Sequence, residues 1–256
     1  MRKLLIGALA MTLASAPAAS AQDMQPTWYT IFADHVAISD RQAYDEAGRD
    51  FARLFEEKGV KDVAWVTITG GELGYTYAIP GYGPADMATM NAAWGAAMTA
   101  VGDEGRRISA RSDALVESRE MYYLLLRPEL SYNSDAVAFK VDEPYRHYVQ
   151  FAVHPTKTQE FEASAKAWAK AYADHGIERG FRVYEYITGA DLPMYLLVED
   201  ARDEAHHETL GAQIDKTLGA DQEPLMRQTG ATLRSVREME GWVRPELSYP
   251  AMSGGN

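Results

Sequence analysis

The chain has 256 residues, no cysteine and a formal net charge of −12, with 37 acidic against 25 basic side chains. The absence of cysteine excludes disulfides, thiolate metal ligands and a cysteine nucleophile. The excess of negative charge repels a phosphate backbone, and because no basic stripe offsets it, we expect no nucleic-acid partner.

Residues 1–21 have the features of a secretory signal peptide. Arg2 and Lys3 are basic, residues 4–14 are apolar, and Ala19–Ala21 forms a small-residue cleavage site. The apolar run is too short to cross a bilayer. We therefore expect cleavage after Ala21, a periplasmic or secreted mature protein, and no membrane span in that mature chain.

Residues 27–133 predict the order strand, helix, strand, strand, helix, strand. Strands are expected at 28–36, 63–69 and 75–79 and before 127, and a long helical region at 85–114. Ser39 and Gln42 have the spacing of a capping box at the start of the first helix. Tyr44 and Phe51 fall on one face of that helix, and Gly59 stands where a left-handed helix end is expected.

Residues 145–250 predict the same order again. Strands are expected at 147–154, 181–187 and 194–198, and a helical region at 203–229. Thr156 and Gln159 repeat the capping-box spacing, and Gly176 repeats the glycine after the helix. Residues 134–144 are the expected linker, and residues 251–256 are expected to be a disordered tail.

A hexapeptide gives the strongest evidence for an internal repeat. Arg127–Tyr132 recurs letter for letter as Arg244–Tyr249, 117 residues later. Three shorter matches keep the same order: Arg119–Met121 with Arg237–Met239, Phe32–His35 with Phe151–His154, and Ile68–Gly70 with Ile187–Gly189. We infer a tandem duplication of an α+β unit, and we expect the proline to end the strand and the charges of the hexapeptide to link the halves.

The element order βαββαβ is the ferredoxin-like arrangement, in which helices cover one face of the sheet. On element order, unit length and duplication, the chain resembles the dimeric α+β barrel superfamily. That superfamily includes antibiotic-biosynthesis-monooxygenase-like, stress-responsive A/B-barrel and NIPSNAP-like proteins and the haem-containing chlorite dismutases. The resemblance implies two tandem ferredoxin-like repeats that form an intramolecular pseudo-dimeric barrel, with a ligand cavity between the sheets. It assigns no catalytic residue.

Strand alternation predicts which side chains face that cavity. With Val149, Phe151 and Val153 toward the helices, the alternate residues face inward. The resulting ligand-binding candidates are Trp65, Tyr75, Tyr77, Tyr148, Gln150, Arg182, Tyr184, Tyr186 and Tyr195. Aromatic walls with a few polar groups are typical of small-molecule pockets. A polar, hydrogen-bonded interface between two sheets would show the same pattern.

His35 and His154 are the predicted catalytic residues. A neutral imidazole accepts or donates a proton near neutral pH and ligates metals or haem iron. The duplication predicts that the two occupy equivalent positions near the ends of the first strands. The alternative is that both cap strand ends. Arg182 has two interpretations, as a partner for an anionic ligand or as the counter-ion of an acid of the chain.

His206 and His207 suggest a metal site less strongly. Asp203 and Glu204 stand three or four residues before them, a spacing that brings ligands together on a helix. Acidic residues are also favoured at a solvated helix start. We therefore predict no metal site. The stripe Met87, Met90, Trp94 and Met98 has helical spacing and predicts core packing.

Three functions are compatible with these residues. The first is binding of a small apolar or aromatic molecule in the barrel, with cofactor-free oxygenation or cyclisation as the reaction that the resemblance implies. The second is haem binding of the chlorite-dismutase type through a histidine. The third is a non-enzymatic module that binds another envelope protein. The sequence leaves the ligand, the reaction and the oligomeric state open.

Overall fold

The computed structural model describes residues 27–70, 74–133, 142–189 and 191–250. The expected signal peptide, most of the expected linker and the tail lie outside the described residues. The strands are β1 (Trp28–Val36), β2 (Val66–Gly70), β3 (Gly74–Pro80), β4 (Val116–Leu126), β5 (Tyr145–Val153), β6 (Arg182–Tyr186), β7 (Met194–Ala201) and β8 (Leu233–Val243). The helices are α1 (Arg41–Glu57), α2 (Met87–Asp113), α3 (Thr158–Asp174), α4 (Glu204–Leu218) and α5 (Gln222–Gly230).

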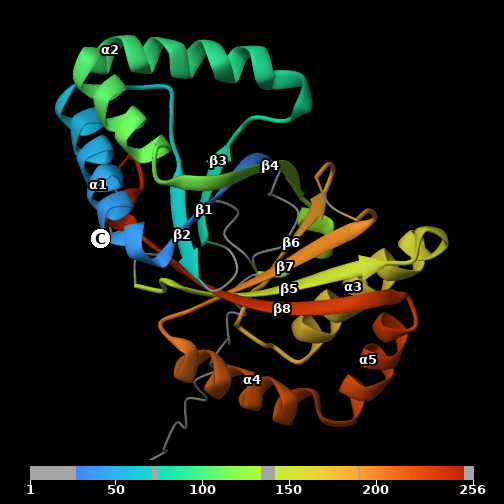
Figure 1. Ribbon diagram of the computed structural model, residues 1–256. Helices are drawn as coiled ribbons and strands as arrows, with labels where there is room; N and C mark the ends of the chain where they lie inside the picture. Colours follow the sequence, from blue (N-terminus) through green and yellow to red (C-terminus); the bar gives the residue numbers. More distant parts are fainter. Residues whose placement is uncertain (1–26, 71–73, 134–141, 190, 251–256) are drawn as a thin grey trace, which may run out of the picture.

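The eight strands close into one barrel in the order β1-β3-β2-β8-β5-β7-β6-β4. Helices α1 and α2 cover the first half of the barrel, and α3, α4 and α5 cover the second half on the opposite side (Figure 1). Two antiparallel pairings join the halves: Ile68 of β2 lies opposite Val243 of β8, and Leu124 of β4 lies opposite Tyr186 of β6. No helix in the described part of the chain is long and apolar enough to cross a membrane.

Three pairs of corresponding elements in the two halves have the same interval. β5, α3 and β8 begin and end 117 residues after β1, α1 and β4. β1 has a bulge between His35 and Val36, and β5 has the same bulge between Ala152 and Val153. The structural counterpart of His35 is therefore Ala152, and the predicted equivalence of His35 and His154 is wrong. That prediction relied on the match of Phe32–His35 with Phe151–His154. These two segments are 119 residues apart, two more than the structural interval of 117.

The helix starts differ from the prediction, and the helix ends agree with it. Short 3-10 turns, Ile38–Asp40 and Pro155–Lys157, precede α1 and α3, and neither described helix start has a side-chain cap hydrogen bond. The turn itself satisfies backbone N–H groups that a capping box would otherwise bind. Gly59 and Gly176 have φ angles of 58° and 63°, which confirms the left-handed helix ends.

Each copy of the hexapeptide docks on the opposite half of the chain. Tyr249 forms an antiparallel bridge with Trp65, and Tyr132 forms the corresponding bridge with Phe181. The indole N–H of Trp65 donates to the carbonyl of Leu247 at 2.7 Å. The end of each half is therefore part of the helix-covered layer of the other half.

The charges of the two hexapeptides reach the helices of the opposite halves. Arg244 pairs with Asp45 of α1 at 2.7 Å, and Arg127 pairs with Glu162 of α3 at 3.0 Å. Asp45 and Glu162 occupy the same position in their helices. The link between the halves that the repeated charges predict is present in both copies.

The docked hexapeptides should contribute strongly to stability. Leu130 is fully buried among the side chains that cover the second half. Leu130→Ala should lower the free energy of unfolding by about 2–5 kcal/mol, because the lost methyl groups leave a cavity. Urea denaturation followed by circular dichroism measures this change. Met226→Ala is the control, since Met226 is 59% exposed. A loss below about 1 kcal/mol for Leu130→Ala would contradict the docking.

Candidate functional site in the first half

The interior of the barrel is mostly filled by side chains. Ile31, Ile68, Leu124, Leu196 and Val198 pack there with several tyrosines. The remaining cavity has a volume of about 60 Å³. A cavity of about 150 Å³ is needed to hold benzene. The barrel interior is therefore a core with room for water, and the predicted ligand chamber between the sheets is too small for an aromatic molecule.

Five of the predicted ligand-binding residues lie in that interior. Tyr148, Arg182, Tyr184 and Tyr186 line the small cavity, and Gln150 donates to the Tyr186 hydroxyl at 2.7 Å. The guanidinium of Arg182 forms an ion pair with Asp200. Burial raises the pKa of Tyr184 and of Tyr186. These groups form a polar network inside the barrel, in which Arg182 is the counter-ion of Asp200, although Nε of Arg182 has no hydrogen-bond partner among the described residues.

The other four predicted residues face the helices. Trp65 packs against Phe55 and Trp94, Tyr75 and Tyr77 lie beside Tyr44 of α1, and Tyr195 stacks on Phe161 of α3. The predicted orientation of Trp65, Tyr75, Tyr77 and Tyr195 toward the barrel cavity is wrong. Both faces of these strands are covered, so apolar side chains occur on both and alternation cannot fix the direction.

The two predicted catalytic histidines lie at the rim. The His35 side chain is 39% exposed, with Nε2 4.0 Å from a carboxylate oxygen of Glu120. His154 is exposed, and its backbone N–H donates to Thr232. Neither imidazole is among the described residues that line the barrel cavity or the pocket between sheet and helices.

A larger pocket lies between the outer face of the first-half sheet and helices α1 and α2. Its volume is about 380 Å³, within the range of about 300–1,000 Å³ for small-molecule sites. The following residues line this first-half pocket: Phe32, Asp34, Tyr44, Ala47, Gly48, Phe51, Trp65, Tyr77, Ile79, Met90, Asn91, Trp94, Met98, Ile108, Ser109, Ser112, Asp113, Arg119 and Leu247. Most of these side chains are aromatic or apolar, and three members of the predicted methionine–tryptophan core stripe form part of one wall.

A chain of hydrogen bonds crosses the polar end of the pocket. Asp34 is 1% exposed, and its carboxylate accepts hydrogen bonds from Nε and Nη2 of Arg119 at 2.6 and 2.7 Å. The Tyr44 hydroxyl donates to Asp34 Oδ2 at 2.6 Å, and the Tyr77 hydroxyl donates to the Tyr44 oxygen at 2.8 Å. We call these four residues the Asp34 relay.

The direction of these bonds decides what the Asp34 relay can do. Every hydroxyl proton points toward Asp34, so a lone pair of the Tyr77 oxygen is left to accept a hydrogen bond from the pocket. Burial raises the pKa of Tyr44, and the bond to Asp34 raises it further. Burial and the neighbouring Tyr44 raise the pKa of Tyr77. The relay is thus arranged to accept a proton at Tyr77 and to pass another from Tyr44 to the Asp34 carboxylate.

The rim of the pocket carries charge. The Arg119 side chain is 45% exposed and also contacts Asp113 at 3.1 Å. The bidentate bond to Asp34 raises the pKa of Arg119, so the guanidinium stays charged. An entering ligand therefore meets, at the polar end of a mainly aromatic and apolar pocket, a guanidinium that is paired with the carboxylates of Asp34 and Asp113.

The second half has apolar side chains at the positions of the Asp34 relay. Strand and helix correspondence matches Asp34, Tyr44, Tyr77 and Arg119 with Phe151, Phe161, Leu197 and Val236. Phe161 stacks on Phe151 at 5.5 Å and on Tyr195 at 4.6 Å between ring centres, which fills the equivalent space. The shared architecture therefore does not require the four polar groups, and their presence in one half indicates a function.

The sequence contained a signal for these residues. Tyr44 was predicted as a core residue, and Asp34 and Arg119 occurred only as letters of repeated motifs. A comparison of the halves at the interval of 117 sets Asp34, Tyr44 and Arg119 against three apolar residues, and the strand pairing sets Tyr77 against Leu197 at an interval of 120. The matches at 118 and 119 obscured that comparison.

The sequence matches no family model and no curated protein. Solved structures resemble the fold. An anthrone oxidase-like protein shares 13% identity with a TM-score of 0.56, over 88% of this chain and 93% of its own. A proposed monooxygenase from Fusobacterium nucleatum shares 13% identity with a TM-score of 0.55, over 85% and 92%. A proposed monooxygenase from Lactobacillus acidophilus shares 9% identity with a TM-score of 0.54, over 86% and 94%.

These likenesses show the fold alone. The chain is an α+β protein with a closed eight-stranded barrel, the fold that it shares with these solved structures. A haem held by histidine does not fit the first-half pocket, because no histidine is among the described residues that line it. Tyrosine can also ligate haem iron, but the Tyr44 oxygen donates to Asp34 and accepts from Tyr77 within the Asp34 relay.

The raised pKa values of Tyr44 and Tyr77 predict loss of stability in alkali. Above the ordinary tyrosine pKa of about 10, the unfolded chain loses these protons before the folded chain does, so stability falls as pH rises. Each buried tyrosine contributes up to about 1.4 kcal/mol per pH unit. Urea unfolding at pH 9, 10 and 11 should show this decline, with a shallower slope for Tyr44→Phe. Equal slopes for both proteins would contradict the assigned environment.

Proposed function

We propose that this chain is an exported protein that binds a small phenolic aromatic molecule in the first-half pocket and oxidises it with dioxygen without a metal or organic cofactor. The observation that carries the proposal is the Asp34 relay, which occurs in an open aromatic pocket in one half and is replaced by apolar packing in the other. A tandem duplication accounts for this difference, because the second copy was free to fill the space between sheet and helices with apolar side chains while the first copy carries the polar groups.

The walls of the pocket suit a flat ring system. Trp65 and Trp94 lie 5.6 Å apart between ring centres, and Phe51 lies 5.9 Å from Trp65. Met90 and Met98 add adaptable, polarisable surface. Aromatic rings stack on such walls and bury large area, so two or more fused rings would bind mainly through the walls.

The polar end of the pocket suits a hydroxyl group on that ring system. A phenol can donate a hydrogen bond to the Tyr77 oxygen. Because the Asp34 carboxylate attracts the hydroxyl protons of Tyr44 and Tyr77, this bond increases the electron density on the phenol oxygen. Transfer of the phenol proton to Tyr77 moves the Tyr77 proton to Tyr44 and the Tyr44 proton to Asp34. Arg119 stabilises the negative charge that remains at this end of the pocket.

An electron-rich phenolate can reduce dioxygen directly. The enol tautomer of a ketone with an activated ring methylene is such a phenol, and its hydroxyl proton is the one that passes to the Asp34 relay. The anion left behind has carbanion character at the former methylene carbon, which adds O₂ and takes the proton back from the relay to form a hydroperoxide. Loss of water then gives a carbonyl. One oxygen atom enters the product and the other leaves as water, and all four electrons come from the substrate. No external reductant is needed, and the anthrone oxidase-like protein of similar fold supports this reaction class.

A hydroxyanthrone tests the proposed reaction. The wild-type mature chain should consume oxygen and introduce one ¹⁸O atom from ¹⁸O₂ into the anthraquinone, as measured by mass spectrometry. Tyr44→Phe should lower kcat by about 10²-fold or more, because the proton path ends at Tyr77. Tyr75→Phe is the matched control. Tyr75 lies on β3 like Tyr77, but its hydroxyl binds Asp45 at 2.7 Å and takes no part in the Asp34 relay.

A second variant separates function from folding. The quadruple variant Asp34→Phe/Tyr44→Phe/Tyr77→Leu/Arg119→Val copies the second half and should fold cooperatively but bind no hydroxyanthrone. Equal activity in this variant, equal losses in Tyr44→Phe and Tyr75→Phe, or a Soret band in protein from its own host would overturn the proposal.

A further inference from the structure

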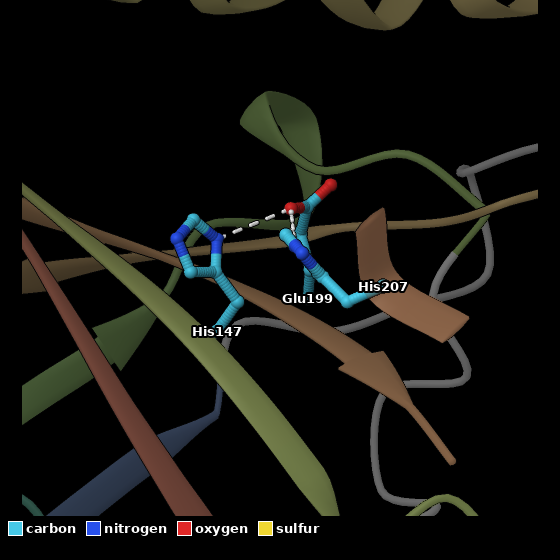
Figure 2. A group of neighbouring side chains, drawn as sticks. All are labelled: His147, Glu199 and His207. Atoms are coloured by element: carbon cyan, nitrogen blue, oxygen red, sulfur yellow. Dashed lines mark hydrogen bonds and ion pairs between the residues drawn. The ribbon is translucent and has the colours of Figure 1, made fainter. Parts of the chain in front are cut away.

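Two histidines and a glutamate meet on the outer side of the second-half sheet. His147 lies on β5, Glu199 on β7 and His207 near the start of α4, and Figure 2 shows both imidazoles directed at one oxygen of the glutamate. His207 follows Glu199 by eight residues, whereas His147 lies on an earlier strand, and none of the three lines the first-half pocket. The proposed oxidation therefore makes no use of this cluster.

The spacing of the three groups matches a metal centre. Glu199 Oε2 lies 3.4 Å from Nδ1 of His147 and 3.1 Å from Nε2 of His207. One ligand atom from each residue lies within 4.8 Å of the other two. Tetrahedral zinc with bonds of about 2.0–2.1 Å holds its ligand atoms about 3.3 Å apart. Small side-chain rotations bring all three atoms to that distance.

The surroundings hold the three candidate ligands in place. The three side chains are 14–15% exposed, so they are held in place but remain reachable from solvent. Glu238 lies 3.6 Å from Nε2 of His147. An outer carboxylate at that nitrogen fixes the tautomer that leaves Nδ1 free for a metal.

The two adjacent histidines have different roles. The His206 ring accepts the backbone N–H of Arg202 at 3.3 Å, and the His206 N–H donates to Asp203 at 2.7 Å, so this residue belongs to the helix start. His207 turns toward the sheet instead. Of the 15 residues of α4, all described, only Ile214 and Leu218 are buried. The first turns of α4 therefore contact the sheet mainly through polar groups.

We propose that His147, Glu199 and His207 bind a divalent transition-metal ion, with zinc preferred, and that water takes the fourth position. Two imidazoles and one carboxylate are a ligand set that zinc uses in proteins. Such an ion would fasten the start of α4 to β5 and β7. This inference replaces the sequence expectation that the chain has no metal site.

One neighbouring cation weakens the site. Nη2 of Arg179 lies 3.4 Å from the same oxygen of Glu199. Its charge repels a bound ion, so an ion must share the carboxylate with the guanidinium. Arg179→Gln should therefore bind zinc more tightly than the wild type, which a cluster that serves only as an ion-pair network would not do.

Metal binding is measured on the mature chain without a histidine tag. Isothermal titration with Zn²⁺ should give one site per chain, and Co²⁺ should give the intense visible absorption of tetrahedral nitrogen and oxygen ligands. His207→Ala should lose at least 100-fold in affinity, and Glu238→Gln should lose about 10-fold. His206→Ala is the matched control and should keep the wild-type affinity.

Several outcomes would overturn the site. Absence of Zn²⁺ uptake by the wild type would contradict the site, and equal losses of affinity in His206→Ala and His207→Ala would indicate adventitious surface binding. If His207→Ala fails to fold by circular dichroism, the Co²⁺ spectrum of the wild type decides, and an octahedral spectrum contradicts the proposal. None of these measurements depends on the oxidation of an aromatic substrate.

Discussion

The exchange of hexapeptides between the halves is the constraint on which the rest of the structure depends. The bridges Trp65–Tyr249 and Tyr132–Phe181 attach the end of each half to the helix-covered layer of the other. The β2–β8 and β4–β6 pairings close the barrel beside these bridges. Because the exchange also carries Leu247 into the first half, the second half supplies one wall of the first-half pocket. Neither layer is complete within its own half.

This shared frame makes the difference between the halves informative. Both halves keep the residues that hold the hexapeptide, such as Tyr75 with Asp45 and Tyr195 with Glu162. In the described residues, Asp34 of the first half is a fully buried carboxylate held by an arginine and a tyrosine, and its counterpart in the second half is Phe151. A buried charge costs stability unless it is fully paired, and an apolar replacement is usually at least as stable. The first half keeps this costly arrangement where the layer is hollow, which is expected of a functional site.

The sequence predicted the fold better than the site, for physical reasons. The order of elements, the bounds of β1 and the helix ends at Gly59 and Gly176 depend on local patterns, and the structure agrees with them. Which face of β2 or β3 points inward depends on the other layers, because aromatic side chains suit both sides of a covered sheet. The pocket lies between layers, so strand alternation cannot reveal it. The convergence of His147, Glu199 and His207 likewise depends on the packing of α4 against the sheet, and the spacing of these residues in the sequence does not indicate it.

The central claim is that an aromatic ligand occupies the first-half pocket. It is tested most directly by ¹⁹F NMR of protein labelled with 5-fluorotryptophan, whose five tryptophan resonances are assigned with single Trp→Phe variants. Addition of a hydroxyanthrone should shift the resonances of Trp65 and Trp94 and leave that of Trp168, in the second half, unchanged. A shift at Trp168 with none at Trp65 and Trp94 would contradict the account.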